Sequence, residues 1–205
     1  MKAMKFLPAL LLIATCAVAE EIQQMPAEQA GKIARKVAAA LGSLSDAPFA
    51  VDADPEKSAG IKAGGDTGLL AIPDRKITAE TVANASASVS ALGQLWMRNV
   101  VPAVNNASAD PAKLRTVTVR DGDQEAKVEV YFLGITRTDA GAVELALYAK
   151  DKEPLVKVAL VKTDAPASVT PIALDGHKEG VNSGVLVVTV FGSYKADVLV
   201  TKPRE

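Results

Sequence analysis

Cysteine, histidine and aromatic residues are scarce in this sequence. Its 205 residues include one cysteine, Cys16, and one histidine, His177, and only 4% of them are aromatic. A single histidine excludes every site that needs two imidazole groups. The scarcity of aromatic rings argues against a surface that stacks sugars or nucleic-acid bases, and it requires a core of Val, Leu, Ile and Ala.

Long apolar runs are absent as well, apart from a short one near the start. Residues 6–14 are apolar, two lysines precede them, and a small-x-small sequence ends at Ala19. A bilayer-spanning helix needs about 20 apolar residues, so this run is too short. It has the pattern of a secretory signal peptide that is cleaved before Glu20. The sequence therefore predicts a signal peptide at 1–19 and a soluble mature protein of bacterial type, periplasmic or secreted.

Cys16 leaves an alternative open, because a cysteine that closes an apolar run can be the lipidated residue of a bacterial lipoprotein. Thr15 is unfavourable directly before a lipidated cysteine, whereas the cleavage site at Ala19 has no defect, so ordinary cleavage is preferred. Cleavage there also removes Cys16. The mature chain would then have no disulfide, no thiolate nucleophile and no Cys-ligated metal.

Neither sign of charge dominates the chain. It has 23 lysine and arginine residues against 24 aspartate and glutamate residues, for a net charge of −1. An evenly mixed surface gives no electrostatic reason to bind nucleic acid or an anionic membrane. We therefore expect a protein or another cell-envelope component as partner, with no cofactor and no transmembrane segment, and a homo-oligomer remains possible.

Two segments have the spacing of amphipathic helices. The first, 26–41, has a mostly alanine stripe, which favours packing on the domain over binding to a membrane. The second, 78–101, begins at a natural N-cap, Thr78, and repeats apolar residues on one face as far as Trp96. Small side chains along this second segment suggest a helix that lies close against a sheet.

The rest of the chain alternates apolar and polar residues between turn sequences. This pattern predicts a short strand at 69–72 and six or seven more between 114 and 201, joined by connections too short for parallel pairing. The predicted fold class is α+β, with two N-terminal helices packed on an antiparallel β-meander or sandwich of six to seven strands. Residues 20–68 form an N-terminal helix and an irregular segment, and 69–205 form the α+β domain. The predicted strands are 114–120, 127–137, 142–149, 155–162, 169–174, 184–191 and 194–201.

The segment 184–191 differs from its neighbours because it is apolar on both faces. Such a strand is typical of the centre of a sheet that is covered on two sides. One cover can come from the N-terminal segments. The other would then come from a partner that meets the exposed half of the strands, including Tyr131 and Tyr148.

Three groups of residues could carry chemistry. The first, Asp66-Thr67-Gly68, matches the tripeptide of aspartic proteases, in which the carboxylate activates water. That family has an apolar strand before the aspartate, whereas two glycines precede Asp66 here. A turn that enters the strand at 69–72 is the preferred interpretation.

The second group consists of two acidic clusters in predicted loops. One cluster alternates through 52–56, and the other occupies the predicted hairpin turn at 121–125. A calcium loop would need a glycine at its sixth position and a glutamate at its twelfth, where the first cluster has Lys57 and Ala63. No metal site is therefore predicted at either cluster. The acidic residues are Asp52, Asp54 and Glu56, and Asp121, Asp123 and Glu125.

The third candidate is His177, which lies between Asp175 and Glu179 in a predicted polar loop at 175–183. An imidazole near a carboxylate can act as a general base, but it needs a nucleophile. The sequence contains no Gly-x-Ser-x-Gly or Ser-x-x-Lys motif that would supply one. A polar loop residue is therefore the preferred interpretation.

Two functional hypotheses follow from these observations. The favoured one is an exported, non-enzymatic binding or assembly module of the bacterial cell envelope, with no catalytic, cofactor-binding or metal-binding residues assigned. The alternative is a hydrolase that uses acidic loop residues and His177. A pocket that gathers His177 with Asp66 or Asp52 would favour the hydrolase.

Overall fold

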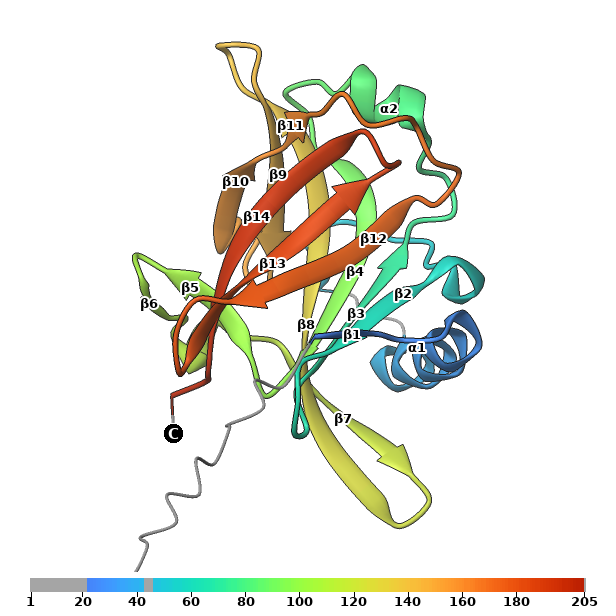
Figure 1. Ribbon diagram of the computed structural model, residues 1–205, viewed down its shortest axis with the longest axis vertical. Coiled ribbons are helices and arrows are strands. Elements are labelled where there is room, and N and C mark those ends of the chain that lie inside the picture. Colours follow the sequence, from blue (N-terminus) through green and yellow to red (C-terminus); the bar gives the residue numbers. More distant parts are fainter. Residues whose placement is uncertain (1–21, 43–45, 205) are drawn as a thin grey trace, which may run out of the picture.

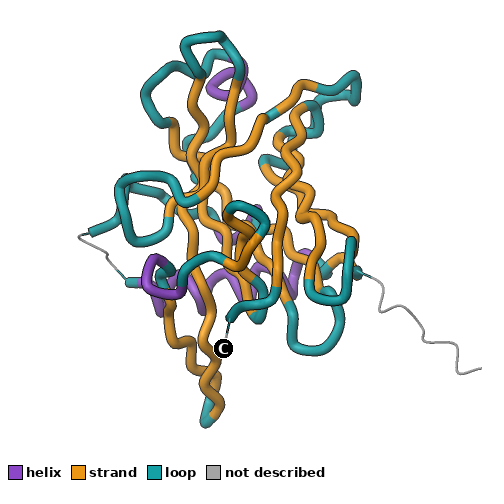
Figure 2. Tube along the Cα trace, turned by 90° about the vertical axis from the view of Figure 1, so that its left-hand side faces the viewer, coloured by secondary structure: helices purple, strands orange, loops and turns teal. Residues whose placement is uncertain are grey.

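The computed structural model describes residues 22–42 and 46–204, which form a sandwich of two antiparallel sheets (Figure 1). Strands account for 46% of the chain and helices for 15%. Figure 2 shows how little of the molecule is helical. The predicted α+β class with two N-terminal helices is therefore wrong, because one of the two predicted helices is a strand. The predicted signal peptide at 1–19 and Cys16 lie outside the described residues.

The larger sheet has eight strands in the order β1-β2-β3-β4-β8-β9-β10, and β7 also pairs with β8. The first two of these strands come from the segment 20–68, for which a helix and an irregular segment were expected. The strands are β1 Gln23–Gln24, β2 Ala59–Lys62, β3 Gly68–Pro73, β4 Ser90–Arg98, β7 Thr116–Asp121, β8 Gln124–Arg137, β9 Val143–Tyr148 and β10 Val156–Ala159.

The smaller sheet has six strands in the order β12-β13-β14-β5-β6, and β11 also pairs with β14. Twice the chain passes directly from one sheet to the other. It bends between β4 and β5 at Asn99, whose φ is 59°, and between β10 and β11 at Leu160. Such bends form the corners of a sandwich. The strands are β5 Val101–Val104, β6 Ala107–Ser108, β11 Val161–Lys162, β12 Ile172–Lys178, β13 Ser183–Val190 and β14 Tyr194–Thr201.

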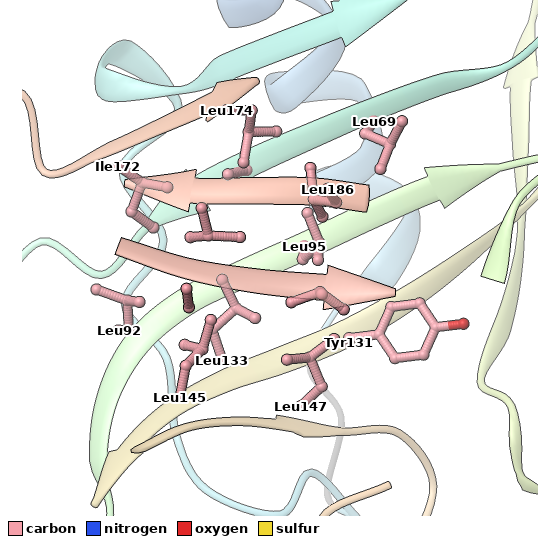
Figure 3. Packing of buried hydrophobic residues seen from close by; sticks show 14 of the residues in the cluster. Leu69, Leu92, Leu95, Tyr131, Leu133, Leu145, Leu147, Ile172, Leu174 and Leu186 are labelled. Carbon is pink, nitrogen blue, oxygen red and sulfur yellow. The ribbon is translucent and has the colours of Figure 1, made fainter. Parts of the chain in front are cut away.

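Side chains alternate between the two faces of the larger sheet. The inner face packs against the smaller sheet and forms the main core, in which leucine is the commonest residue (Figure 3). Tyr131 is fully buried in this core, so it does not need the external partner that the sequence suggested. The inner-face residues include Leu69, Leu95, Tyr131, Leu133, Leu145 and Leu147, which face Ile172, Leu174 and Leu186.

The outer face of the larger sheet is covered by the N-terminal part of the chain. Helix α1, Ala27–Leu41, confirms the predicted helix and buries its small residues against Trp96 and neighbouring side chains. The segment 46–53 continues this cover. Phe49 packs edge-on against Tyr148 with ring centroids 5.2 Å apart, so this tyrosine is covered as well.

The predicted helix at 78–101 is wrong. Only α2, Ala79–Ala83, is helical, with Thr78 as its N-cap, and the chain then continues as strand β4. Because β4 is covered on both faces, its apolar residues follow one another without clean alternation. The four-residue spacing of Leu92 and Trp96 therefore matches a helix only by coincidence. The neighbours Leu95 and Trp96 face opposite sides of the sheet, as strand residues do.

A bulge in β4 further obscures the strand pattern in the sequence. The pairing of β4 with β8 shifts between Ala91 and Gly93, which leaves Leu92 as an extra residue. Gly93 has a φ of 154°, and a Cβ atom there would lie 2.3 Å from the backbone oxygen of Ile72. Only glycine fits this position. An irregularity of this kind removes the two-residue period that would have indicated a strand.

Most strands predicted after residue 114 are confirmed as β7, β8, β9, β13 and β14, and β7 and β8 form the expected hairpin, with its turn at residues 122–123. Two details differ. The predicted strand 155–162 is divided between the sheets as β10 and β11, and β12 continues to Lys178, where a loop was expected. The chain also contains the short strands β5 and β6, which were not predicted. Besides α1, the described residues contain the short helical segments α2, η1 Pro55–Lys57 and η2 Pro111–Lys113.

Candidate functional site

A cleft of about 300 Å³ lies at one end of the sandwich, between the two sheets. Five parts of the described chain line it: Ile22, the turn from β2 to β3, the corner at Asn99, the hairpin of β12 and β13, and the end of β14. These parts are far apart in sequence. They meet because β2, β3 and β12 pack side by side where the two sheets approach each other.

The floor of the cleft is apolar. It consists of side chains that also belong to the core between the sheets, so the cleft opens directly onto that core. Ile22, the first described residue, also lines the cleft and is half-buried. The buried floor residues are Ile61, Leu69, Val100, Leu186 and Val200.

The rim of the cleft is polar. The Asp66 carboxylate accepts a hydrogen bond from Arg98 at 3.2 Å. The backbone oxygen of Asp66 accepts one from the Asn99 side chain at 3.3 Å. On the opposite side, the Thr201 hydroxyl donates to the backbone oxygen of Asn182 at 2.9 Å. Asp66 is therefore an ion-paired turn residue, in agreement with the preferred interpretation of the Asp66-Thr67-Gly68 sequence.

His177 also lines this cleft, but it is a strand residue in β12 and not the loop residue that was expected. Strand alternation places its side chain on the opposite face of β12 from the buried Leu174. Its Nε2 atom lies 4.0 Å from Oε1 of Glu179, and 61% of its side chain is exposed. His177 and Asp66 therefore share a cleft, although no hydrogen bond connects them.

The acidic cluster of 52–56 lies elsewhere, and its carboxylates make ion pairs. Asp54 is buried, with Lys57 Nζ at 3.6 Å and Arg75 Nη1 at 3.7 Å. Asp52 contacts Arg75 too, at 3.6 Å, and lines a separate hollow with Asp74. The structure therefore does not bring Asp52 to His177.

The second acidic cluster occupies the tip of the β7–β8 hairpin, which projects from the sandwich (Figure 1). Glu125 there pairs with Arg120 at 2.6 Å. Across residues 22–42 and 46–204, no group of three or more histidine, cysteine, aspartate or glutamate side chains is arranged to hold a metal ion.

No protein-family model, curated protein or solved structure matches this chain. In the part of the chain that the structure describes, no helix is long and apolar enough to cross a bilayer.

The outer face of the smaller sheet is the second notable surface, and we call it the outer sheet face. The register pairs His177 with Val185 and Val185 with Leu199, so these side chains lie in one row across the face. Val185 is only 7% exposed, Val187 beside the row is half-buried, and Leu199 is 42% exposed. The strand predicted at 184–191 is thus apolar on both faces, but only its inner face is covered by the core. The charged residues around this row are Asp175, Lys195 and Asp197.

Three side chains outside the cleft lining have perturbed acidity. Burial raises the pKa of Glu129, which lies on the inner side of β8. Burial and then the charge of Glu129 raise the pKa of Tyr131, whose hydroxyl has no hydrogen-bond partner among the described residues. Burial likewise raises the pKa of Tyr148. All three groups favour their protonated forms, and no nucleophile among them is activated.

Proposed function

We propose that this protein is an exported, non-enzymatic binding module of the cell envelope, which contacts a protein partner through its outer sheet face. The observation that carries this proposal is the exposed Leu199, with the half-buried Val187 on the neighbouring strand, on a face that the core does not cover. An apolar centre surrounded by mixed charges is the usual composition of a protein interface.

The charges around this row support a protein partner over a membrane surface. Lys195 lies 3.3 Å from Asp197 on β14, and Asp175 stands on β12, on the other side of β13. A surface with both signs of charge offers no net attraction to anionic lipid. It can instead form paired contacts with the polar rim of another protein.

The cleft residues give less support to the hydrolase alternative. His177 and Asp66 line the same cleft, but Asp66 is paired with Arg98 and both side chains are largely exposed. General-base catalysis needs an imidazole within hydrogen-bond reach of the group that it deprotonates. No described serine or threonine hydroxyl forms such a bond with His177 in the structure.

The test is a pull-down from an envelope fraction with a photo-crosslinking residue at position 187. We expect a crosslinked partner that is lost in the Leu199→Asp variant, because a charge in the apolar row disfavours desolvation of the interface. Val169→Asp is the matched control, since Val169 is 95% exposed and lies outside the outer sheet face. Light scattering coupled to size exclusion identifies a second copy of the chain as the partner if the mass doubles.

Equal crosslinking by Leu199→Asp and Val169→Asp would contradict the proposal. A monomer that captures nothing, together with a hydrolytic activity that His177→Ala abolishes, would establish the hydrolase instead.

A further inference from the structure

We propose that two copies of this chain associate through the free edge of strand β7, which pairs antiparallel with β7 of the second copy and joins the two larger sheets. Free backbone groups, a regular register and half-buried valines at this edge support the pairing. Strand β7 shares no residue with the outer sheet face, so this contact is independent of the one proposed above.

Strand β7 is the outer strand of the hairpin that projects from the sandwich, and it pairs only with β8 (Figure 1). Thr116 lies opposite Glu129, and the 2.9 Å bond from the backbone N–H of Val130 to the backbone oxygen of Arg115 flanks this pair. In an antiparallel ladder, a residue in such a position directs its own N–H and C=O away from the neighbouring strand. Because the register is regular, every second residue of β7 does the same. These outward groups form no hydrogen bond with any residue that the structure describes. They belong to Thr116, Thr118 and Arg120.

The other edge strands among the described residues are short, charged or covered. β1, β6 and β11 have two residues each, and β10 has four, with Lys157 exposed. On β12, the Gln24 side chain donates to the backbone oxygen of Leu174 at 2.8 Å. On the far edge of the projecting hairpin, β8 carries the charged Glu125 and Lys127. Short strands and charges protect a sheet edge from pairing. β7 has six residues, and its first four alternate threonine and valine with no charge or proline.

The outward groups of β7 select one two-fold register. An axis at Thr118 places this residue opposite its own copy and places Thr116 opposite Arg120 of the copy, so all the outward groups find partners. An axis at Arg120 would instead oppose two arginines, and like charges directly opposite each other are destabilising. In the chosen register Arg120 faces a threonine and keeps its own partner, Glu125, at 2.6 Å.

The same register brings apolar side chains together. Val117 and Val119 point to the side of the sheet that α1 covers, where they pack on the cluster of Trp96 but stay half-buried. The proposed pairing sets Val117 beside Val119 of the copy, so each valine loses further contact with water. Backbone bonds combined with side-chain contacts at alternate positions are the usual basis of strand addition.

Hydrogen exchange of the backbone amides, followed by NMR at increasing protein concentration, tests the edge directly. We expect the amides of Thr116, Thr118 and Arg120 to exchange several times more slowly at about 0.5 mM than in dilute protein, since a contact of this size is weak. The amides of Val117 and Val119 already bond to β8 and are the internal controls, so their exchange should not change. Sedimentation should show the mass doubling over the same range.

A charge exchange at the axis tests the register. Thr118→Lys and Thr118→Glu should each be monomeric, because the axis places two like charges opposite each other. An equimolar mixture of the two should dimerise again, because lysine then faces glutamate. Thr170→Lys and Thr170→Glu are the matched controls, since Thr170 is exposed in a loop outside β7, and both should dimerise like the wild type. Native emission of Trp96 confirms that each variant is folded.

Leu199→Asp separates this contact from the outer sheet face. It should keep the dimer and lose the envelope partner. The proposal is overturned if the chain stays monomeric at about 0.5 mM, if the mixture of Thr118 variants does not dimerise, or if Leu199→Asp abolishes the dimer, which would assign it to the outer sheet face. Protection of the outward β7 amides only after addition of an envelope extract would also overturn it, because the edge would then bind a strand of another protein.

Discussion

At the scale of single residues, Gly93 is the position where the least change should have the largest effect. An added methyl group would collide with the backbone of β3, at 2.3 Å from the oxygen of Ile72. The φ of 154° at this position would also strain an alanine, because residues with a Cβ atom rarely adopt it. We expect Gly93→Ala to lower the free energy of unfolding by about 3 kcal/mol in urea denaturation.

Gly141→Ala is the matched control for this variant. Gly141 has a φ of 85°, and nothing lies within 4 Å of an added Cβ. It should therefore lose only about 1 kcal/mol through backbone strain. Equal losses for the two variants would mean that the close contact with β3 does not exist.

Glu129 should make the stability of the protein depend on pH. Burial raises its pKa in the folded state above the usual value of a glutamate. The folded state therefore binds a proton more tightly than the unfolded state, so the contribution is complete at low pH and is lost as pH rises through the folded pKa. Glu129→Gln removes this dependence.

We therefore expect the stability difference between Glu129→Gln and the wild type to shift in favour of the variant as pH rises from about 4 towards neutrality. Urea unfolding midpoints measured across this range test the expectation. Parallel curves for the two proteins would show that this carboxyl titrates alike in both states.

At the scale of elements, Trp96 distinguishes strand β4 from a helix. Its side chain lies on the face of β4 that packs against α1 and is 3% exposed, whereas Val89 is 41% exposed. In a helix over 78–101 the two residues would share one buried face. We expect Trp96→Ala to cost about 3 to 5 kcal/mol and Val89→Ala less than about 1 kcal/mol.

Native tryptophan fluorescence should accordingly be blue-shifted relative to the unfolded chain, because Trp96 is the only tryptophan and is buried. Comparable stability losses for the two alanine variants, or red-shifted native emission, would contradict the position of β4.

The two predicted helices explain which elements can be inferred from the sequence alone. Helix α1 is buried on one face only, so its apolar stripe has a clear period and the prediction succeeded. Strand β4 is buried on both faces and carries a bulge, so neither period survives. The spacing of apolar residues identifies an element that is buried on one face. It becomes ambiguous for an element that is buried on both faces.

The cleft could be predicted only in part. Asp66 and His177 stood out as unusual polar residues, and the structure places both at its rim. Its floor could not be predicted, because Leu69 and Leu186 meet only through the packing of two sheets. That contact depends on sandwich topology, which no local pattern encodes.

At the scale of the whole molecule, stability should not depend on metal ions or disulfides. The mature chain predicted from Glu20 contains no cysteine, and both acidic clusters include carboxylates held in ion pairs. We expect the same thermal midpoint with and without EDTA, and with and without a reducing agent. A decrease of more than a few degrees with EDTA would indicate a bound cation that stabilises the folded state.

The pairing of β5 with β14 has a consequence for how the chain folds. It joins Val101 to Thr201, two residues that are far apart in the sequence. Contacts between residues so far apart form slowly, because the intervening chain must lose its entropy before the contact stabilises anything. Strand β5 can pair only once β14 is available. The smaller sheet therefore closes late in folding, and until then the inner face of the larger sheet is exposed to aggregation.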